Sequence, residues 1–240
     1  MKITVIGAGN MGSALITHLA KHHSVVVCNK TSIKGQELAD KAGASYEQDP
    51  AKAIQSADYI VLAVKPKDVE ALAYSIESSI DKKQTVISIL AGTKLEALEQ
   101  LFPKNEVIRL MPNLAIKVNQ GIIGLAPENI TEKKRQEIEA LFSSLGLLLW
   151  IAEDKMDAFA SLAASSPAFI LVLMEAMIES GIHAGLSKEE SKDIVLQVLG
   201  GTAALVKETK KTPEELKWQV TSPGGTTIEG LKELEDNSFR

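Results

Sequence analysis

Three glycines at positions 7, 9 and 12 constrain this chain more than any other feature of its sequence. They follow a short apolar run at residues 3–6 and open a helix-like stretch that reaches about residue 21; a second apolar run occupies residues 25–28. A strand, a glycine turn, a helix and a strand in close succession form the context in which G-x-G-x-x-G binds a dinucleotide. The sequence therefore predicts a nucleotide site near the first residues of the chain.

Each of the three glycines is expected to have its own role. Gly7 permits the tight turn, Gly9 lets the backbone approach a pyrophosphate with no side chain between, and Gly12 lets the helix pack closely on the strand. The helix N-terminus offers free N–H groups and a positive potential to the phosphates.

The cofactor predicted for this turn is NADP rather than NAD. An NAD enzyme places an acidic residue after the second strand to bind the ribose 2′-hydroxyl. Residues 29–34 contain no Asp or Glu, whereas Lys30, Lys34 and the hydroxyls of Thr31 and Ser32 can meet a 2′-phosphate. The alternative is a solvated loop with ordinary surface lysines, and NAD stays open.

Apolar runs alternate with helix-like stretches up to about residue 151. This alternation predicts an α/β fold, a Rossmann-like, doubly wound and mostly parallel sheet. Further strands are expected at residues 44–46, 58–64, 85–90, 107–110, 121–126 and 147–151. Helices are expected at residues 33–41, 68–79 and 130–145, together with a short helix that begins at residue 50 and one that ends near residue 102. Val64, Lys65 and Pro66 follow a strand and are expected to face the ligand crevice, although they also suit a plain strand end.

The strand signal disappears after residue 153, which predicts two domains: a dinucleotide-binding domain at 1–152 and an all-helical domain at 153–240. Helices are expected at 156–164 and 167–185, and the second is apolar on nearly all faces, so it should be buried on several sides, plausibly at a subunit interface. Ser187 with Glu190, and Thr212 with Glu215, form capping boxes for two more helices.

A loop rich in small and hydroxylated residues, 220–228, precedes the last predicted helix. Backbone N–H groups and hydroxyls at a helix N-terminus can bind an anion such as a carboxylate. A generous helix cap is the competing interpretation.

Composition excludes several other function classes. A net charge of −5 gives no reason to expect nucleic acid, and the single cysteine, Cys28, excludes a disulfide framework or a thiolate metal cluster within one chain. No signal peptide is visible, and the apolar stretches at 147–151 and 168–174 are too short to cross a bilayer. We expect a cytoplasmic protein with no membrane partner and no metal.

The chain resembles the pyrroline-5-carboxylate reductase family, which completes proline synthesis. The specific part of the resemblance is Thr221-Ser-Pro-Gly-Gly-Thr-Thr227 with the Gly-Leu that follows. Residues 63–66, 88–92 and 109–113 also match motifs of the family's cofactor domain in the right order, and residues 161–169 are similar to its interdomain helix.

The resemblance implies a role for each matching position. The cofactor, NADPH with NADH as an alternative, would contact Ile6, Gly7, Ala8, Gly9, Asn10, Met11, Gly12, Asn29, Lys30, Thr31, Ala63, Val64, Lys65, Pro66, Ala91 and Gly92. A cyclic imine would bind Ser222, Pro223, Gly224, Gly225, Thr226 and Thr227, with its carboxylate on backbone N–H groups. Thr227 matches the threonine expected to hydrogen-bond the ring nitrogen, which makes it the predicted catalytic residue. The family's helical domain interleaves with its twin, so a homodimer or higher homo-oligomer is implied.

The chain departs from the family pattern in three respects. The interdomain helix has Ala164 and Ser166 where the family is richer in glycine, and Pro50 stands where an asparagine near the adenosine is common. The sequence ends at Arg240, whereas the family usually adds another helix.

The expected reaction is hydride transfer from a nicotinamide to the imine carbon, which gives L-proline. A protonated imine is already electrophilic, so a hydroxyl and good positioning suffice, and none of the histidines is expected to act as an acid or base. A β-hydroxyacid dehydrogenase would carry a catalytic lysine on the long helix, but residues 157–187 contain no Lys or Arg. A related imine reductase, a deazaflavin-dependent NADP reductase and a non-catalytic NADPH-binding sensor remain as alternatives.

Overall fold

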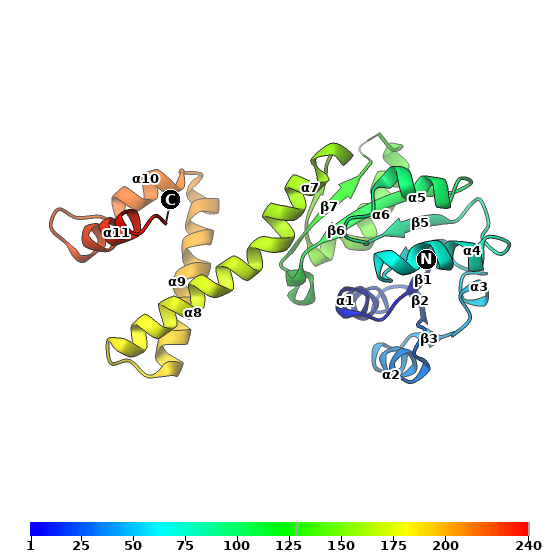
Figure 1. Ribbon diagram of the computed structural model, residues 1–240, viewed down its shortest axis with the longest axis horizontal. Coiled ribbons are helices and arrows are strands. Elements are labelled where there is room, and N and C mark those ends of the chain that lie inside the picture. Colours follow the sequence, from blue (N-terminus) through cyan, green and yellow to red (C-terminus); the bar gives the residue numbers. More distant parts are fainter. Residues whose placement is uncertain (128, 240) are drawn as a thin grey trace. The chain divides into compact units, whose positions relative to one another are not determined.

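The computed structural model describes residues 1–127 and 129–239. The chain divides into two compact units, Met1–Pro167 and Ala168–Arg240 (Figure 1).

The first unit is built on one eight-stranded sheet in the order β3-β2-β1-β4-β5-β6-β7-β8. Every neighbouring pair is parallel except β6 with β7. The connection from β6 to β7 is a single 3-10 turn at Leu114–Val118, too short for the crossover that parallel strands need. The strands are β1 (Lys2–Ile6), β2 (Ser24–Cys28), β3 (Ser45–Tyr46), β4 (Tyr59–Leu62), β5 (Thr85–Ser88), β6 (Glu106–Pro112), β7 (Gly121–Ala126) and β8 (Gly146–Trp150).

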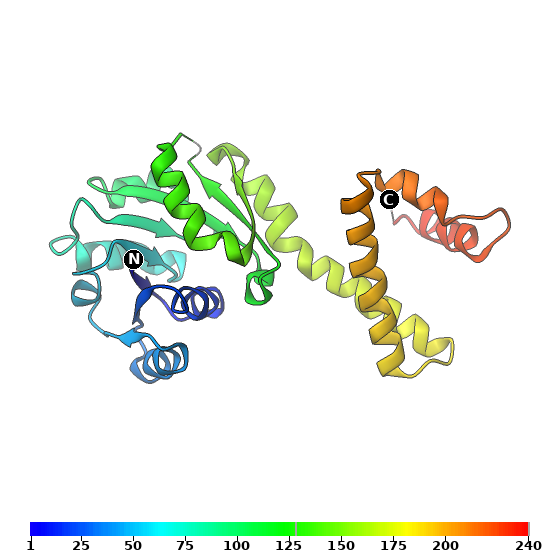
Figure 2. The ribbon, with the colours of Figure 1, turned by 180° about the vertical axis from the view of Figure 1, so that it is seen from behind.

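Helices cover both faces of this sheet, as Figure 2 shows from behind, so the predicted doubly wound, mostly parallel fold is confirmed. One apolar core joins the sheet to α1 (Asn10–Leu19), α2 (Ser32–Ala42) and α6 (Glu132–Phe142). The other core joins it to α3 (Pro50–Ala53), α4 (Val69–Ile76) and α5 (Leu95–Leu101). Alternating strand residues explain the division, because Val5 belongs to the first core and Ile6 to the second.

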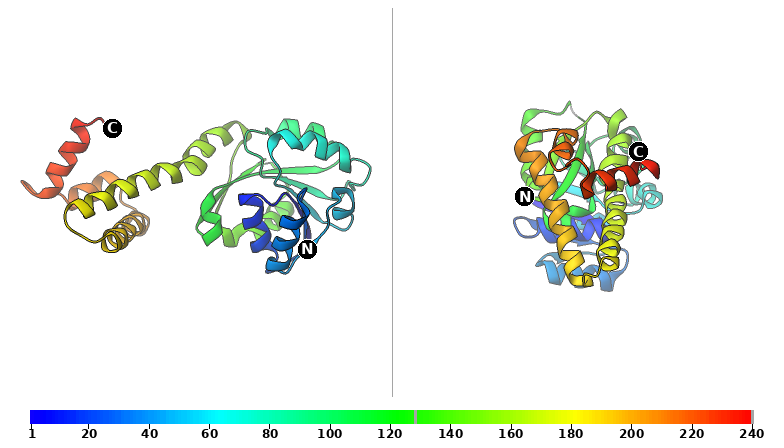
Figure 3. Two further views of the ribbon diagram at one scale, coloured as in Figure 1. Left: turned by 60° about the horizontal axis from the view of Figure 1, so that its bottom comes forward. Right: turned by 90° about the vertical axis from the view of Figure 1, so that its left-hand side faces the viewer.

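All the regular secondary structure in the described part of the second unit, 168–239, is helical (Figure 3). It contains most of α8 (Ser166–His183), then α9 (Lys188–Thr209), α10 (Pro213–Gln219) and α11 (Thr226–Asp236). Both predicted capping boxes are confirmed: the Ser187 hydroxyl accepts from the N–H of Glu190, and the Thr212 hydroxyl accepts from the N–H of Glu215.

The structure corrects the prediction for residues 153–185. One helical run, Glu153–His183, replaces the two predicted helices; it includes α7 (Met156–Phe159) and a π-helical stretch, Ala160–Ser165. By length and composition alone this run could cross a membrane, because Ala and Ser connect the short apolar segments that the sequence shows separately. The expectation that the apolar stretches are too short is therefore wrong for residues 168–174, which belong to this longer run.

The chain itself does not bury α8, so the burial predicted for this helix would have to come from a subunit interface. No residue of α8 is buried, and Phe169, Leu171 and Val172 are among its exposed apolar side chains. An apolar surface of this extent is typical of a face that another molecule covers.

Candidate functional site

A cleft of about 760 Å³ lies at the carboxyl ends of β1, β2 and β4. The strand order reverses between β1 and β4, and ligands of open α/β sheets bind outside the strands at such a point. Four segments and one helix supply its walls: Ile6, Gly7, Ala8, Gly9, Cys28, Asn29, Lys30, Thr31, Gln48, Pro50, Ala63, Val64, Lys65, Lys67, Asp68, Ala71, Leu72 and Ser75.

The three glycines of the turn have distinct local constraints. Gly7 has φ +115°, and a Cβ there would collide with the carbonyl of Ala63 at the end of β4. A Cβ on Gly12 would collide with the Gly7 carbonyl, so the start of α1 packs directly on the turn. A Cβ on Gly9 would meet nothing within 4 Å, which leaves the open space that a phosphate group needs.

Asn29 braces the turn from the end of β2. Its Oδ1 accepts from the N–H of Ala8 (3.1 Å), and its Nδ2 donates to the carbonyl of Thr31 (2.9 Å). Gly9 occupies the N-cap of α1 and has no side-chain cap hydrogen bond. The first N–H groups of α1 are therefore available to an anion.

Ten of the residues predicted to contact the cofactor line this cleft: Ile6, Gly7, Ala8, Gly9, Asn29, Lys30, Thr31, Ala63, Val64 and Lys65. Asn10, Met11, Gly12 and Pro66 are adjacent in the chain but do not line it. Ala91 and Gly92 lie after β5, exposed and outside the cleft.

Exposed lysines give the cleft a cationic rim. Lys30, Lys65 and Lys67 line it together with one carboxylate, Asp68. Lys34, suggested as a 2′-phosphate partner, lies instead in a separate hollow beside Glu37 and Lys41. The helical turn at the start of α2 carries it away from the cleft.

Sequence reasoning named Pro50, which lines the cleft, through the family resemblance and missed the rest of the lining. Gln48 follows β3, so the rule that ligands meet the carboxyl ends of strands could have found it. Ala71, Leu72 and Ser75 lie on α4, and no pattern in the sequence marks them. Cys28 is buried at the cleft wall; burial, with Glu47 and Asp49 nearby, raises the pKa of its thiol to about 11, so it stays protonated at neutral pH.

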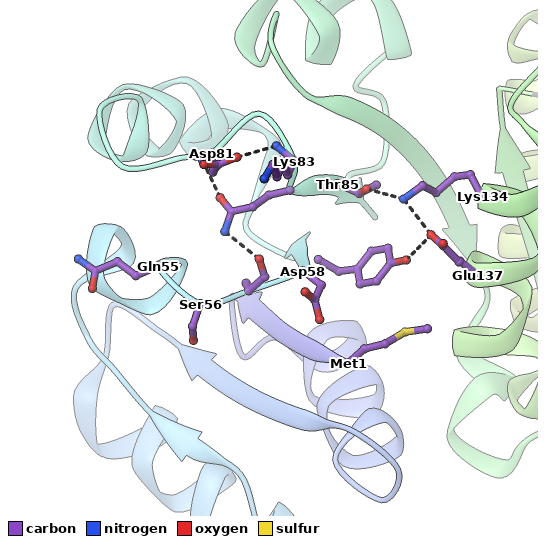
Figure 4. Close-up of a pocket in the computed structure, with 12 residues that line it drawn as sticks. Met1, Gln55, Ser56, Asp58, Asp81, Lys83, Thr85, Lys134 and Glu137 are labelled. Carbon is purple, nitrogen blue, oxygen red and sulfur yellow. Dashed lines mark hydrogen bonds and ion pairs between the residues drawn. The ribbon is translucent and has the colours of Figure 1, made fainter.

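A second hollow, about 510 Å³, lies at the amino ends of the strands (Figure 4). The Tyr59 hydroxyl donates to Glu137 (2.9 Å), and the Lys134 ammonium contacts both Glu137 (3.0 Å) and the Thr85 hydroxyl (3.0 Å). Hydrogen bonds from Lys134 and Tyr59 lower the pKa of Glu137. Burial and the hydrogen bond to Glu137 raise the pKa of Tyr59. These groups satisfy one another and join α6 to the sheet, so we assign them a structural role.

In the second unit, the loop before α11 has the geometry of an anion site. Gly224 has φ +66°, the Ser222 carbonyl accepts from the N–H of Gly225 (3.1 Å), and Gly225 caps α11 without a side-chain hydrogen bond. Pro223 and Thr226 are exposed, and Thr227 is half-buried in the first turn of the helix. The first N–H groups of α11 are therefore open to a carboxylate.

The four histidines lie away from the cleft lining. His18 is 8% exposed and its Nε2 lies 2.9 Å from the Ser144 hydroxyl, which identifies it as a packing residue between α1 and the turn before β8. His22 and His23 lie in a hollow at the amino end of the sheet, and His183 is exposed at the end of α8. Among residues 1–127 and 129–239, no group of three or more His, Cys, Asp or Glu side chains is arranged to hold a metal ion.

Two family models match the chain. Residues 153–240 match the pyrroline-5-carboxylate reductase dimerisation domain, and residues 2–92 match the NADP oxidoreductase, coenzyme F420-dependent domain.

Full-length relatives agree with the first of these matches. Pyrroline-5-carboxylate reductase of Aquifex aeolicus is 36% identical over 100% of this chain and 91% of its own length. The enzyme of Methanosarcina acetivorans is 35% identical over 100% of this chain and 91% of its own.

Solved structures give the same result. Plasmodium falciparum pyrroline carboxylate reductase with NADP bound superposes with a TM-score of 0.90 at 28% identity, over 100% of this chain and 91% of that one. The Coxiella burnetii pyrroline-5-carboxylate reductase gives 0.85 at 32% identity, over 99% and 91%. The cleft, the loop before α11 and these full-length matches together show that the chain belongs to the pyrroline-5-carboxylate reductase family.

Proposed function

We propose that this protein reduces 1-pyrroline-5-carboxylate to L-proline with NADPH, as a homodimer or higher homo-oligomer. The observation that carries the proposal is the relationship over the whole chain to enzymes named for this reaction. The chain itself supplies both recognition elements that the reaction needs, a dinucleotide cleft and an uncapped helix N-terminus.

The cleft fits a dinucleotide with a 2′-phosphate. The open space at Gly9 and the uncapped start of α1 suit a pyrophosphate, and Gly7 keeps the turn tight enough to present both. Lys30 and Thr31, at the end of β2, would hold the 2′-phosphate that NAD lacks. When bound, NADPH supplies the hydride that reduces the imine carbon.

The loop before α11 would bind and orient the imine. Ser222, Gly224 and Gly225 shape a helix N-terminus whose backbone N–H groups would hold the substrate carboxylate. The Thr227 hydroxyl would hydrogen-bond the ring nitrogen, which needs no strong acid because a protonated imine is already an electrophile. The remaining residues of the proposed substrate site are Pro223 and Thr226.

The helical part would form the dimer and complete the site. We propose that it begins at residue 153, where the long helical run starts, and that residues 1–152 form the cofactor domain. A second copy of the chain covering α8 would explain why the helix is apolar yet exposed. On this account, the length and composition of residues 153–183 reflect an interface, and we place the protein in the cytoplasm.

Substitution of Thr227 tests the role of the loop. Thr227→Ala should lower kcat for pyrroline-5-carboxylate by about 10²- to 10³-fold, the usual cost of losing one positioned donor. Thr227→Ser keeps the hydroxyl and should retain most of the turnover. NADPH affinity, from fluorescence titration, should be unchanged in both variants, since Thr227 lies outside the cofactor cleft. Normal turnover by Thr227→Ala would remove the role given to its hydroxyl.

A further inference from the structure

The helical run that follows the sheet contains an irregular stretch, the π-helical residues Ala160–Ser165. π-helical geometry is rare and is frequently found at functional sites. Pro167, two residues after this stretch, explains the irregular geometry. Pro167 has no N–H, so it cannot donate to the carbonyl four residues earlier, and its ring crowds that carbonyl. The carbonyl in question belongs to Ala163.

Asn113 supplies the donor that Pro167 cannot. Its Nδ2 donates to the Ala163 carbonyl (3.2 Å), and its Oδ1 accepts from the N–H of Ile122 on β7 (3.2 Å). Its own N–H donates to the Ile122 carbonyl (3.1 Å), so the Asn113 backbone is held as well. The Asn113 amide thus donates to the helix and accepts from the strand at once.

The start of the run is attached to the same two strands. Arg109 on β6 forms an ion pair with Glu153, and Met156 is buried with Met111 and Ala126. The Phe159 ring packs where Gly124 lacks a side chain, because a Cβ there would come within 2.7 Å of the ring. Figure 1 shows α7 beside β6 and β7. The hydrogen bond from Asn113 to Ala163 links the residue that follows β6 to the π-helical stretch.

This attachment lies on the functional edge of the sheet. Asn113 directly follows the carboxyl end of β6, and β6 is two strands from β4, whose end lines the cleft. A dinucleotide spans such a crevice with one half on each side of the point where the strand order reverses. The adenosine half belongs with β1 and β2, so the nicotinamide half extends toward β5, β6 and Asn113.

We propose that Asn113 is a positioning residue for the reduction, because its amide fixes the π-helical stretch at the nicotinamide end of the cleft. The proposal rests on the proposed function. Asn113 acts through residues 160–165 and need not touch the substrate. Misplacing a positioning element by about 1 Å can cost about 10²-fold in rate.

Two variants remove the donor. Asn113→Asp has the same shape and still accepts from Ile122, but it cannot donate to Ala163 when ionised. Asn113→Ala removes both bonds. We expect kcat for pyrroline-5-carboxylate to fall about 10- to 100-fold in both. NADPH affinity, measured by fluorescence titration, should stay within about twofold because β1, β2 and β4 supply the cleft.

Asn105 provides a matched control at the amino end of the same strand. Its Nδ2 donates to the carbonyls of Asp81 (2.8 Å) and Gln84 (2.9 Å). Asn105→Ala should lower the melting temperature to a similar degree as Asn113→Ala and leave kcat within about twofold. An equal loss of kcat in both variants would overturn the proposal, because general destabilisation would then explain it.

A double variant separates positioning from simple hydrogen-bond satisfaction. Pro167→Ala restores an N–H for the Ala163 carbonyl, so Asn113→Asp/Pro167→Ala should recover the melting temperature lost in Asn113→Asp. It should not recover kcat, because a regular α-helical turn would move the side chains of the stretch. Recovery of kcat, normal kcat in Asn113→Asp, or loss of a cooperative thermal transition in that variant would each overturn the proposal.

The wild type is assayed first to keep the two hypotheses distinct. A wild type that binds NADPH but does not reduce pyrroline-5-carboxylate refutes the proposed function and this inference with it. An active wild type together with an active Asn113→Asp refutes this inference alone.

Discussion

The two units of this chain differ in where their apolar surface is buried. The first unit encloses the central strands between two layers of helices, and Val5, Val61 and Ile87 are fully buried. In residues 168–239, only Ser191, Val195 and Leu216 are buried. Val172, in the middle of α8, is 65% exposed.

The two units therefore differ in whether their apolar faces find partners within the chain. The strand and helix patterns of the first unit find their partners within the chain, so the unit has its own core. The apolar faces of the second unit find no cover within the chain and match a dimerisation domain. In the proposed homo-oligomer a second copy would supply the missing layer, and the stability of the unit would then depend on protein concentration.

A substitution that prevents a second copy from covering α8 should have the largest effect on assembly and turnover. Val172→Glu would bury an unpaired carboxylate at the interface, which costs several kcal/mol, on the order of 3–5. We expect a monomer by light scattering and a loss of turnover of about 100-fold or more. NADPH binding should persist, since the cleft belongs to the first unit.

Leu147→Glu is the matched control for this variant. Leu147 is an apolar residue of β8 in the first unit and is 58% exposed. We expect this variant to remain oligomeric and active. An oligomeric Val172→Glu would contradict the assignment of α8 to an interface.

Substitutions of Gly9 and Gly12, both in the first unit, should have effects of intermediate size. A methyl group on Gly9 meets open space, so Gly9→Ala should keep the melting temperature and weaken NADPH binding about 10- to 100-fold. Gly12→Ala should instead lower the free energy of unfolding by about 1–3 kcal/mol, since the methyl group meets the Gly7 carbonyl. Calorimetry and cofactor titration of both variants measure the two effects; the same profile in both would contradict the distinct roles.

The smallest expected effect is a pH dependence confined to the first unit. Burial, with Lys21, His22 and His23 nearby, lowers the pKa of His18 from 6.5, so the folded chain binds this proton less readily than the unfolded chain. The contribution of His18 to stability is therefore complete above 6.5 and is lost as the pH falls from there toward the lowered value. Urea unfolding at about pH 7.5 and about pH 5.5 should show a smaller loss of stability in His18→Gln than in the wild type. An unchanged slope in the variant would show that other groups carry the dependence.

Local patterns in the sequence predicted the parts of the fold that local interactions decide. The turn at Gly7 and the two capping boxes each depend on a few neighbouring residues, and the structure confirms them. The rule for strand ends similarly led to Val64, Lys65 and Pro66, of which Val64 and Lys65 line the cleft.

Features that depend on distant residues were not predictable in the same way. The sequence predicts that a helix starts at Pro167, but the helical run continues through it, since the side chain of Asn113, 50 residues before Ala163, replaces the missing donor. The displacement of Lys34 from the cleft depends on where α2 turns, and the part of the cleft formed by α4 depends on tertiary packing. The exposure of α8 depends on a second molecule, which a single sequence does not display.

The most direct test of the account is steady-state reduction of pyrroline-5-carboxylate by the full-length protein, with NADPH and NADH assayed in parallel. We predict formation of proline with both reactants consumed in equal amounts, and a higher kcat/KM with NADPH because Lys30 and Thr31 meet its 2′-phosphate. Saturable NADPH binding with no turnover of pyrroline-5-carboxylate would contradict the central claim and identify the protein as a cofactor-binding sensor.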